Sequence, residues 1–177
     1  MNRNLIIIAV ILLTASPTFA QHDNSTNDAK VLQHKNILGA FVGNTIISPS
    51  GFNLPTIGIE YVREVNHNFG IGLIAEVEIG SHIIQKGESG AIISEVERES
   101  AFLVLPAAYF RLYKGLILSA GYGVELEKNE NLGLFKLSME YKLAMKNEQW
   151  IVLPTLSWDH TRLFNGWVYG VNFAYIF

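Results

Sequence analysis

Asp159, His160 and Thr161 form the run of the chain whose residue types come closest to a catalytic cluster. A His that is oriented by a carboxylate can take the proton of a nearby hydroxyl, such as that of Ser157, and so activate it as a nucleophile. An isolated surface His is more often an ordinary polar loop residue. We therefore keep His160, Asp159 and Ser157 as candidates for the weaker interpretation and expect no enzyme.

Acidic residues offer a second kind of chemistry. Glu95, Glu97 and Glu99 alternate and would share one face of an extended segment, where carboxylate oxygens could hold a hard cation. A solvated acidic stretch that keeps an exposed strand edge from pairing is the more ordinary role. The other His residues show no ligand spacing, so we expect no metal and no cofactor.

The composition excludes several classes of protein. Of the 177 residues 49% are hydrophobic and only 16% are charged, which argues against disorder and against a charge-rich soluble surface. The formal charge of -3, without a basic block, makes nucleic acid an unsuitable partner. The chain has no Cys, which excludes disulfides, thiolate metal sites and Cys nucleophiles.

The first residues are typical of an export signal. Arg3 is followed by an unbroken apolar run and then by Thr18, Phe19 and Ala20, which form a small-residue cleavage site. The apolar run is too short for an uncleaved membrane helix, which needs about 20 residues. We expect a signal peptide over 1–20, a flexible polar leader over 21–35 and one folded domain over 36–177.

That domain has a hydrophobic period of two, which predicts strands. Trp167, Tyr169 and Val171 share one face of the last segment, whereas Val168 and Gly170 lie on the other. Eight such segments follow residue 36, each about as long as a tilted strand that crosses a bilayer needs to be, roughly 9 to 11 residues. The sequence does not settle which face of the first segment points outward.

A backbone that crosses lipid without helices must close into a barrel. We therefore predict an all-β fold, an eight-stranded antiparallel up-and-down transmembrane β-barrel with both termini on one side. The longest connection is expected over residues 81–98, with others over 48–54, 128–131 and 160–166 on the same side. Pro106 and Pro154 fall within strands, where we expect local bulges.

The second face of the segments decides between a lipid-facing barrel and a soluble ligand barrel. It is rich in Gly, including Gly70, Gly72, Gly121, Gly123 and Gly170, which suits the narrow interior of eight strands better than a solvated surface. Aromatic residues also fall into two belts near the strand ends. The belt residues are Tyr61, Phe69, Phe110, Tyr141, Trp150, Tyr175 and Phe177 at the end of the termini, and Trp158 and Trp167 at the other end.

Two stretches carry a resemblance to a known family. The aromatic C-terminal strand, residues 167–177, resembles the signal by which outer-membrane barrels are recognised for insertion. Residues 96–143, with Gly121-Tyr122-Gly123 and Met139-Glu140-Tyr141, are similar to small outer-membrane β-barrel proteins of Bacteroidetes-type bacteria, with an OmpA/OmpX-like barrel architecture. The resemblance implies the cell outer membrane of a Gram-negative bacterium, assembly by the barrel assembly machinery and contact with lipids and lipopolysaccharide. It brings no catalytic residues.

Charged residues on the predicted lumen face form a network in which opposite charges are expected to pair. The predicted network consists of Glu60, Glu76, Glu78, Arg111, Glu125, Lys136, Glu140, Lys142 and Asp159. We expect a monomeric barrel with a side-chain-filled lumen and a structural or surface-interaction role. The alternatives are a narrow pore or ligand-binding barrel that favours cations at an acidic outer mouth, and less readily a lipid-modifying enzyme. In the last case Arg162 stands where lipid A deacylases have Ser.

Overall fold

The computed structural model describes residues 35–48, 50–80, 82–86, 94–98, 100–112, 115–127, 131–144 and 149–177. The predicted signal peptide, and the predicted leader apart from Lys35, lie outside these residues. Among the described residues, no helix is long and apolar enough for a membrane span. The strands are β1 (Asn36–Ser48), β2 (Phe52–Glu64), β3 (Phe69–Glu78), β4 (His82–Lys86), β5 (Ser94–Arg98), β6 (Ala101–Arg111), β7 (Leu116–Leu126), β8 (Asn131–Tyr141), β9 (Leu143–Ala144), β10 (Trp150–Thr161) and β11 (Asn165–Ile176).

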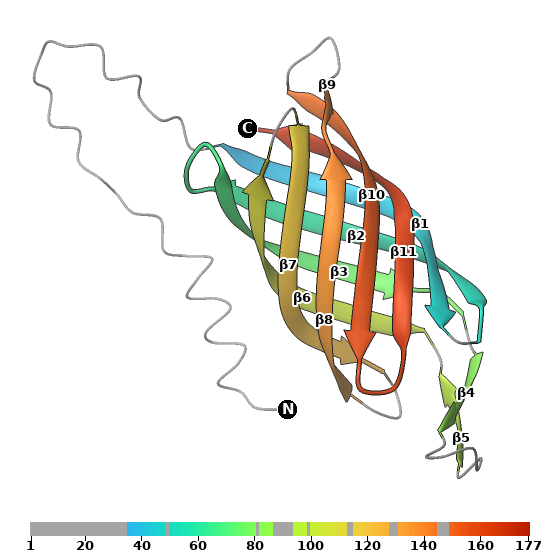
Figure 1. Ribbon diagram of the computed structural model, residues 1–177. Coiled ribbons are helices and arrows are strands. Elements are labelled where there is room, and N and C mark those ends of the chain that lie inside the picture. The colour runs from blue at the N-terminus through green and yellow to red at the C-terminus, as the bar shows by residue number, and fades with distance from the viewer. Residues whose placement is uncertain are drawn as a thin grey trace, which may run out of the picture. The chain divides into compact units, whose positions relative to one another are not determined.

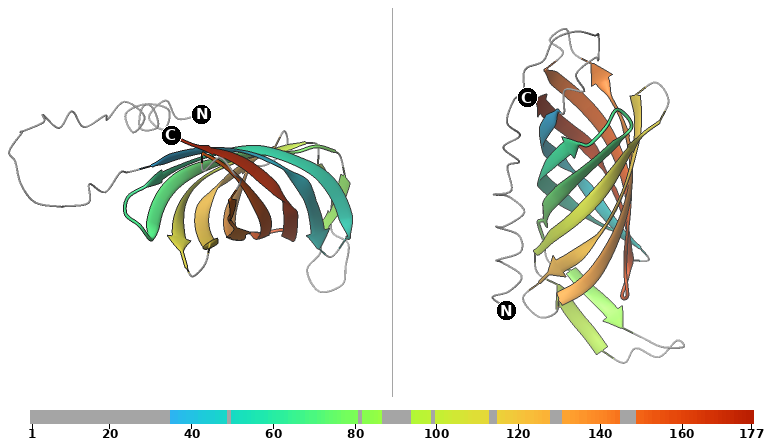
Figure 2. Two further views of the ribbon diagram at one scale, coloured as in Figure 1. Left: turned by 90° about the horizontal axis from the view of Figure 1, so that it is seen from above. Right: turned by 90° about the vertical axis from the view of Figure 1, so that its left-hand side faces the viewer.

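Eight of these strands close into a barrel (Figure 1). Each pairs antiparallel with its neighbours in the order β1, β2, β3, β6, β7, β8, β10, β11, and β11 returns to pair with β1. The short β9 continues the line of β8 along β10, while β4 and β5 form a separate two-stranded sheet. Figure 2 shows the barrel strands lying side by side with a common tilt. The predicted all-β, eight-stranded antiparallel fold is confirmed.

Side chains alternate between the two faces of every barrel strand, as the period of two predicts. In β1, whose faces the sequence left open, Leu38 and Val42 are exposed on the outside, whereas Phe41, Thr45 and Ile47 are buried inside. Each of the eight strands exposes large apolar side chains. Examples from successive strands are Leu38, Ile59, Leu73, Phe102, Tyr122, Met139, Leu156 and Phe173.

The expectation of bulges at Pro106 and Pro154 is wrong. The β6–β7 register is the same before and after Pro106, although Leu105 and Pro106 themselves drop out of that ladder. Pro154 pairs in register with Val171 of β11, and on its other side it lies at the break between β8 and β9. Because Pro lacks an N–H, each interrupts pairing to one neighbouring strand without inserting an extra residue.

Both ends of the described chain lie at one end of the barrel, which we call the terminal end; the opposite end is the far end. Asn36 and Phe177 exchange backbone hydrogen bonds of 2.9 Å there. At the far end the connections between β1 and β2 and between β10 and β11 are tighter than predicted, because β2 begins at Phe52 and β10 continues to Thr161. Gly51, at φ 72°, completes the first of these turns by donating to Ile47. Only the connection between β3 and β6, which contains β4 and β5, is long.

Candidate functional site

Side chains from the barrel wall fill the lumen, and glycines on the inner face leave the space for them. The ring of Phe41 in β1 lies over Gly43 and Gly170, where an added Cβ would come within 2.6 Å of the Phe41 ring at Gly170. Tyr109 lies over Gly72 in the same way, at 2.9 Å. The glycines on the inner face are therefore places where large lumen side chains lie over the same or the neighbouring strand.

Strand β6 supplies an apolar wall to the lumen. Its inward residues Leu103, Leu105 and Tyr109 are buried and pack with Ile74 of β3 and Leu134 of β8. Since β3 and β8 flank β6 and β7 in the sheet, this cluster spans the interior rather than lying along one seam. Both faces of β6 are thus apolar: one packs in the lumen and the other, with Phe102 and Phe110, is exposed.

Lys136 forms ion pairs across the polar half of the lumen. Its Nζ lies 2.8 Å from Oε2 of Glu76 and 3.0 Å from Oδ2 of Asp159. Asp159 is its register partner on β10, whereas Glu76 is on β3, which is not a neighbour of β8. The Lys136 side chain is only 2% exposed. It thus forms a buried bridge between non-neighbouring strands that would be costly to break from either side.

An apolar cluster crosses the lumen at the far end. Phe164, from the turn between β10 and β11, is buried against Ile47, Leu54 and Leu132. The Thr161 hydroxyl fixes this turn by donating to the Phe164 carbonyl at 3.1 Å and accepting from the Phe164 N–H at 3.2 Å. This end therefore carries an apolar plug, which the sequence did not reveal.

The plug changes the interpretation of the predicted acidic outer mouth. Glu76, Glu78, Glu125 and Asp159 do lie on the inner face toward the far end, but all four are buried. They form part of the packed interior and do not line an open entrance. The predicted cation-attracting mouth is therefore not formed by these carboxylates.

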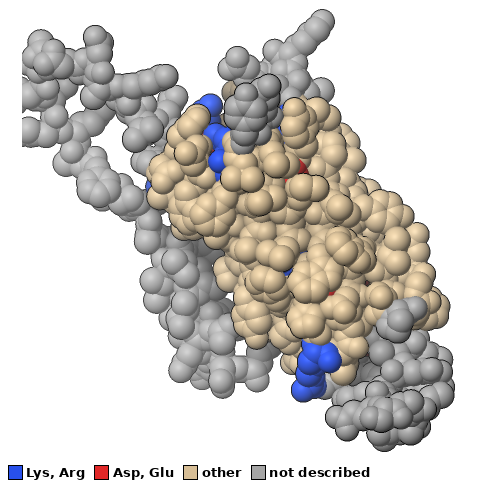
Figure 3. Space-filling model, viewed as in Figure 1, with Lys and Arg blue, Asp and Glu red and all other residues tan. Residues whose placement is uncertain are grey.

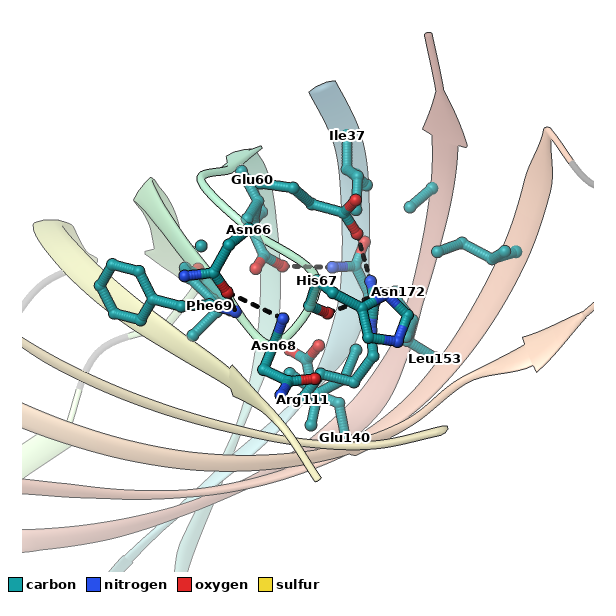
Figure 4. Close-up of a pocket in the computed structure, with 18 residues that line it drawn as sticks. Ile37, Glu60, Asn66, His67, Asn68, Phe69, Arg111, Glu140, Leu153 and Asn172 are labelled. Atoms are coloured by element: carbon teal, nitrogen blue, oxygen red, sulfur yellow. Dashed lines mark hydrogen bonds and ion pairs between the residues drawn. The ribbon is translucent and has the colours of Figure 1, made fainter. Parts of the chain in front are cut away.

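The terminal end instead holds a pocket (Figure 4). About 40 Å³ of it is open to water-sized molecules. At its rim Arg111 pairs with Glu64 and donates through Nη1 to the His67 carbonyl at 3.2 Å. The turn that follows β2 is shaped by Asn66, whose Oδ1 accepts the N–H groups of Asn68 and Phe69, both at 2.9 Å.

Glu60, Glu140 and Asn172 form the inner end of this pocket. They also line a second, smaller cavity of about 10 Å³ that reaches Glu76 and Ser157. All three are buried, and Asn172 donates through Nδ2 to Oε2 of Glu60. Lys142, the remaining member of the predicted network, is half-buried just beyond the end of β8. Within the predicted network, the Lys136 bridge is thus separate from a carboxylate pair, Glu60 and Glu140, that lies nearer the termini.

The candidate catalytic residues are not brought together. Ser157 and Asp159 point into the lumen, where both are buried, whereas His160 is on the outer face of β10. The His160 ring stacks on Trp158 with centroids 5.4 Å apart, and its Nδ1 lies 2.7 Å from Oδ1 of Asn165. The physical reason is the strand itself: consecutive residues face opposite ways, and the prediction had placed His160 in a loop.

Metal ligation has little support in the described residues. They contain no group of three or more His, Cys, Asp or Glu that could hold a metal ion. Glu99 lies outside the described residues, as do the side chains of Glu95 and Glu97 in β5.

The predicted aromatic belts correspond to clusters near the strand ends. At the terminal end Phe69 packs on Phe110 at 5.2 Å between centroids, and Trp150 packs on Tyr175 at 5.0 Å. Toward the far end Trp158 lies opposite Trp167 in the register. The other members are on the outer face near the terminal end: Tyr61, Tyr141 and Phe177. Figure 3 shows Lys and Arg mainly at the upper and lower margins of the described surface, with a nearly uncharged band between them.

Comparisons with known proteins agree with the barrel. Neither a protein-family model nor a curated protein matches the chain. Similar solved structures include that of Ail, the attachment invasion locus protein of Yersinia pestis, at 9% identity, with a TM-score of 0.53 over 81% of this chain and 99% of that one. The complex of Ail with the heparin analogue sucrose octasulfate has 11% identity and a TM-score of 0.53 over the same shares. The structure of the same outer membrane protein in a phospholipid bilayer nanodisc has 10% identity and a TM-score of 0.50, again over 81% and 99%.

Proposed function

We propose that this chain is a Gram-negative outer-membrane β-barrel with a structural or surface-interaction role and a lumen that does not conduct. A cleavable signal peptide over residues 1–20 exports it, a periplasmic leader follows, and the terminal end of the barrel faces the periplasm. The Bacteroidetes-type origin indicated by residues 96–143 belongs to the same proposal.

One observation carries the membrane part of the proposal: all eight strands expose large apolar side chains on the outside while charged side chains are buried within. A soluble monomer rarely exposes an apolar surface larger than a few hundred Å². In a bilayer the same surface faces hydrocarbon, and closure of the barrel satisfies the backbone groups that lipid cannot. The aromatic clusters near both ends then lie at the two membrane interfaces.

The lumen supports a role that does not depend on conduction. Passage along the barrel meets the buried Lys136 bridge and then the Phe164 plug. Barrels of eight strands are in general just wide enough for their side chains to fill. A narrow cation pore, the alternative function, would need both barriers to move.

The likeness to Ail supports a role at the cell surface. The name of that protein refers to attachment and invasion, and one of its structures holds a heparin analogue. In the proposed orientation, the corresponding outward feature of this chain is the long connection between β3 and β6. We propose this connection as the region through which the barrel meets an external partner.

The remaining partners follow from the membrane location. Outer-membrane lipids and lipopolysaccharide would surround the apolar outer face, and the barrel assembly machinery would recognise the last barrel strand, β11. We propose a monomer, because the barrel has no open edge through which another chain could add a strand. Nucleic acid and cofactors have no part in this proposal.

The test combines location with conductance. Expressed in a Gram-negative host, the protein should fractionate with the outer membrane and show a heat-modifiable shift in gel mobility. Purified and reconstituted in planar bilayers, it should stay electrically silent at high protein load. Recovery as a soluble periplasmic protein would contradict the membrane assignment, and steady cation-selective steps lost on neutralising Glu76, Glu78 and Glu125 would favour the pore.

A further inference from the structure

The terminal-end pocket carries chemistry that a purely structural barrel does not need. We propose that it binds a small organic ammonium ion, with the charged nitrogen between Glu60 and Glu140 and the alkyl part against the apolar wall. This inference goes beyond the proposed surface role and rests on the lumen alone. The proposed orientation of the barrel matters only for one point, namely that the pocket opens to the periplasm.

The charges inside the lumen are not balanced. Lys136 pairs with Glu76 and Asp159, and Arg111 pairs with Glu64. Within the described part of the chain, Glu60 and Glu140 form no ion pair with Lys or Arg, although both are buried. A buried carboxylate is costly without a partner of opposite charge. Both residues line the two cavities, so a cation that enters from the terminal end reaches both.

A hydrogen-bond acceptor without a partner lies at the same place. Asn172 is 2% exposed and lines both cavities. Its Nδ2 donates to Glu60, whereas its Oδ1 has no hydrogen-bond partner in the described structure. Gly39 leaves the room for this side chain, since a Cβ there would meet Oδ1 and come within 2.8 Å of Nδ2. The inner end therefore presents an amide oxygen and two carboxylates as acceptors, with the Tyr109 hydroxyl also in the lining, and an ammonium group offers three donors.

The apolar wall of the pocket favours an organic cation over a metal ion. Ile37, Val62, Ile117, Ile151 and Leu153 line the pocket. A hard metal ion takes about six to eight oxygen ligands, and the described residues contain no cluster of three acidic or His ligands. The open volume of about 40 Å³ exceeds the ~10–15 Å³ that one water needs. It suits a short alkyl chain such as that of propylammonium.

Calorimetric titration of the full mature barrel, folded in detergent at neutral pH, tests the proposal. The probe is propylammonium chloride, and the comparators are neutral 1-propanol, sodium chloride and calcium chloride. We expect saturable binding of propylammonium and none of 1-propanol. The variants Glu60→Gln and Glu140→Gln should each weaken binding by about tenfold or more, because each removes a charge-assisted contact. Glu127→Gln, a matched change in a residue that does not line the pocket, should bind as the wild type does.

Several outcomes would overturn the proposal. They are the absence of saturable binding to the folded wild type, unchanged binding in both Gln variants, and displacement of the probe by equal concentrations of sodium or calcium. Folding of each variant is checked by heat-modifiable mobility. If the Gln variants do not fold, Leu153→Phe, which narrows the apolar wall without changing a charge, must weaken binding. These measurements are made in detergent and do not depend on the membrane location. A negative result would therefore reject the ammonium site alone, and fractionation would still test the outer-membrane location.

Discussion

Lys136 and Glu76 meet inside the barrel from strands that are not neighbours in the sheet, with Nζ 2.8 Å from Oε2. The Lys136 side chain also reaches Asp159 on the adjacent β10. This contact ties opposite parts of the wall together at a level where the lumen is otherwise polar. In the proposed function it is one of the two barriers to conduction.

Replacing Lys136 by Met should destabilise the barrel by about 3–5 kcal/mol, because Glu76 and Asp159 would remain buried without their cation. The measurement is reversible urea unfolding in detergent, followed by heat-modifiable mobility. Lys35→Met, outside the strands, is the control and should have little effect. Adding Glu76→Gln and Asp159→Asn to Lys136→Met should recover much of the loss, and a triple variant no more stable than the single one would contradict the bridge.

Gly170 and Gly166, in the same strand, should respond differently to the same substitution. A Cβ at Gly170 would meet the backbone carbonyl of Val42 and come within 2.6 Å of the Phe41 ring, whereas at Gly166 the nearest atom is 3.4 Å away. Gly170→Ala should therefore cost about 1–3 kcal/mol of unfolding free energy through overpacking, and Gly166→Ala much less. Both are measured by urea unfolding. Equal effects at the two positions would show that the inner face at Gly170 is not as closely packed as described.

Phe164→Ala should weaken the far-end plug without opening a pore. The loss of a buried ring costs about 3–5 kcal/mol, but the Lys136 bridge still crosses the lumen. Planar bilayers with the folded variant should stay silent. Steady channel steps from this single variant would mean that the bridge does not close the lumen and that the plug alone does.

His160→Ala should leave the lipid A of the host unchanged. His160 points outward while Asp159 and Ser157 point into the lumen, so the three side chains cannot act on one substrate. Mass spectra of lipid A from cells that express the wild type and the variant should be identical. A mass difference that depends on His160 would revive the enzyme interpretation.

The sequence predicted the barrel well because its strongest signal is local. Alternation in segments such as residues 167–177 requires only that strands place successive side chains on opposite faces. The same rule would have separated His160 from Asp159 had β10 been predicted to continue to Thr161. A local pattern therefore fails mainly where the end of an element is misplaced.

What the sequence could not reveal depends on distance across the lumen. Lys136 pairs with Glu76 and Asp159, whereas Glu60 and Glu140 are left together. This division follows from the tilt and register of eight strands. Phe164 could have been suspected, since an aromatic residue in a tight turn between strands needs a place to pack. The two Pro residues were misjudged because a closed sheet can lose ladder hydrogen bonds at one position without changing register.

The central claim is that the outer face of the barrel contacts lipid, and spin labelling tests it most directly. Because the chain has no Cys, single Cys residues can be introduced at Ile59 on the outer face and at Thr56 on the inner face of β2. In phospholipid bilayers, electron paramagnetic resonance should show the label at residue 59, where Ile is 63% exposed, relaxed by oxygen and shielded from a water-soluble nickel reagent. The label at residue 56 should be accessible to neither. Free access of the nickel reagent to the label at residue 59 would contradict a lipid-facing barrel.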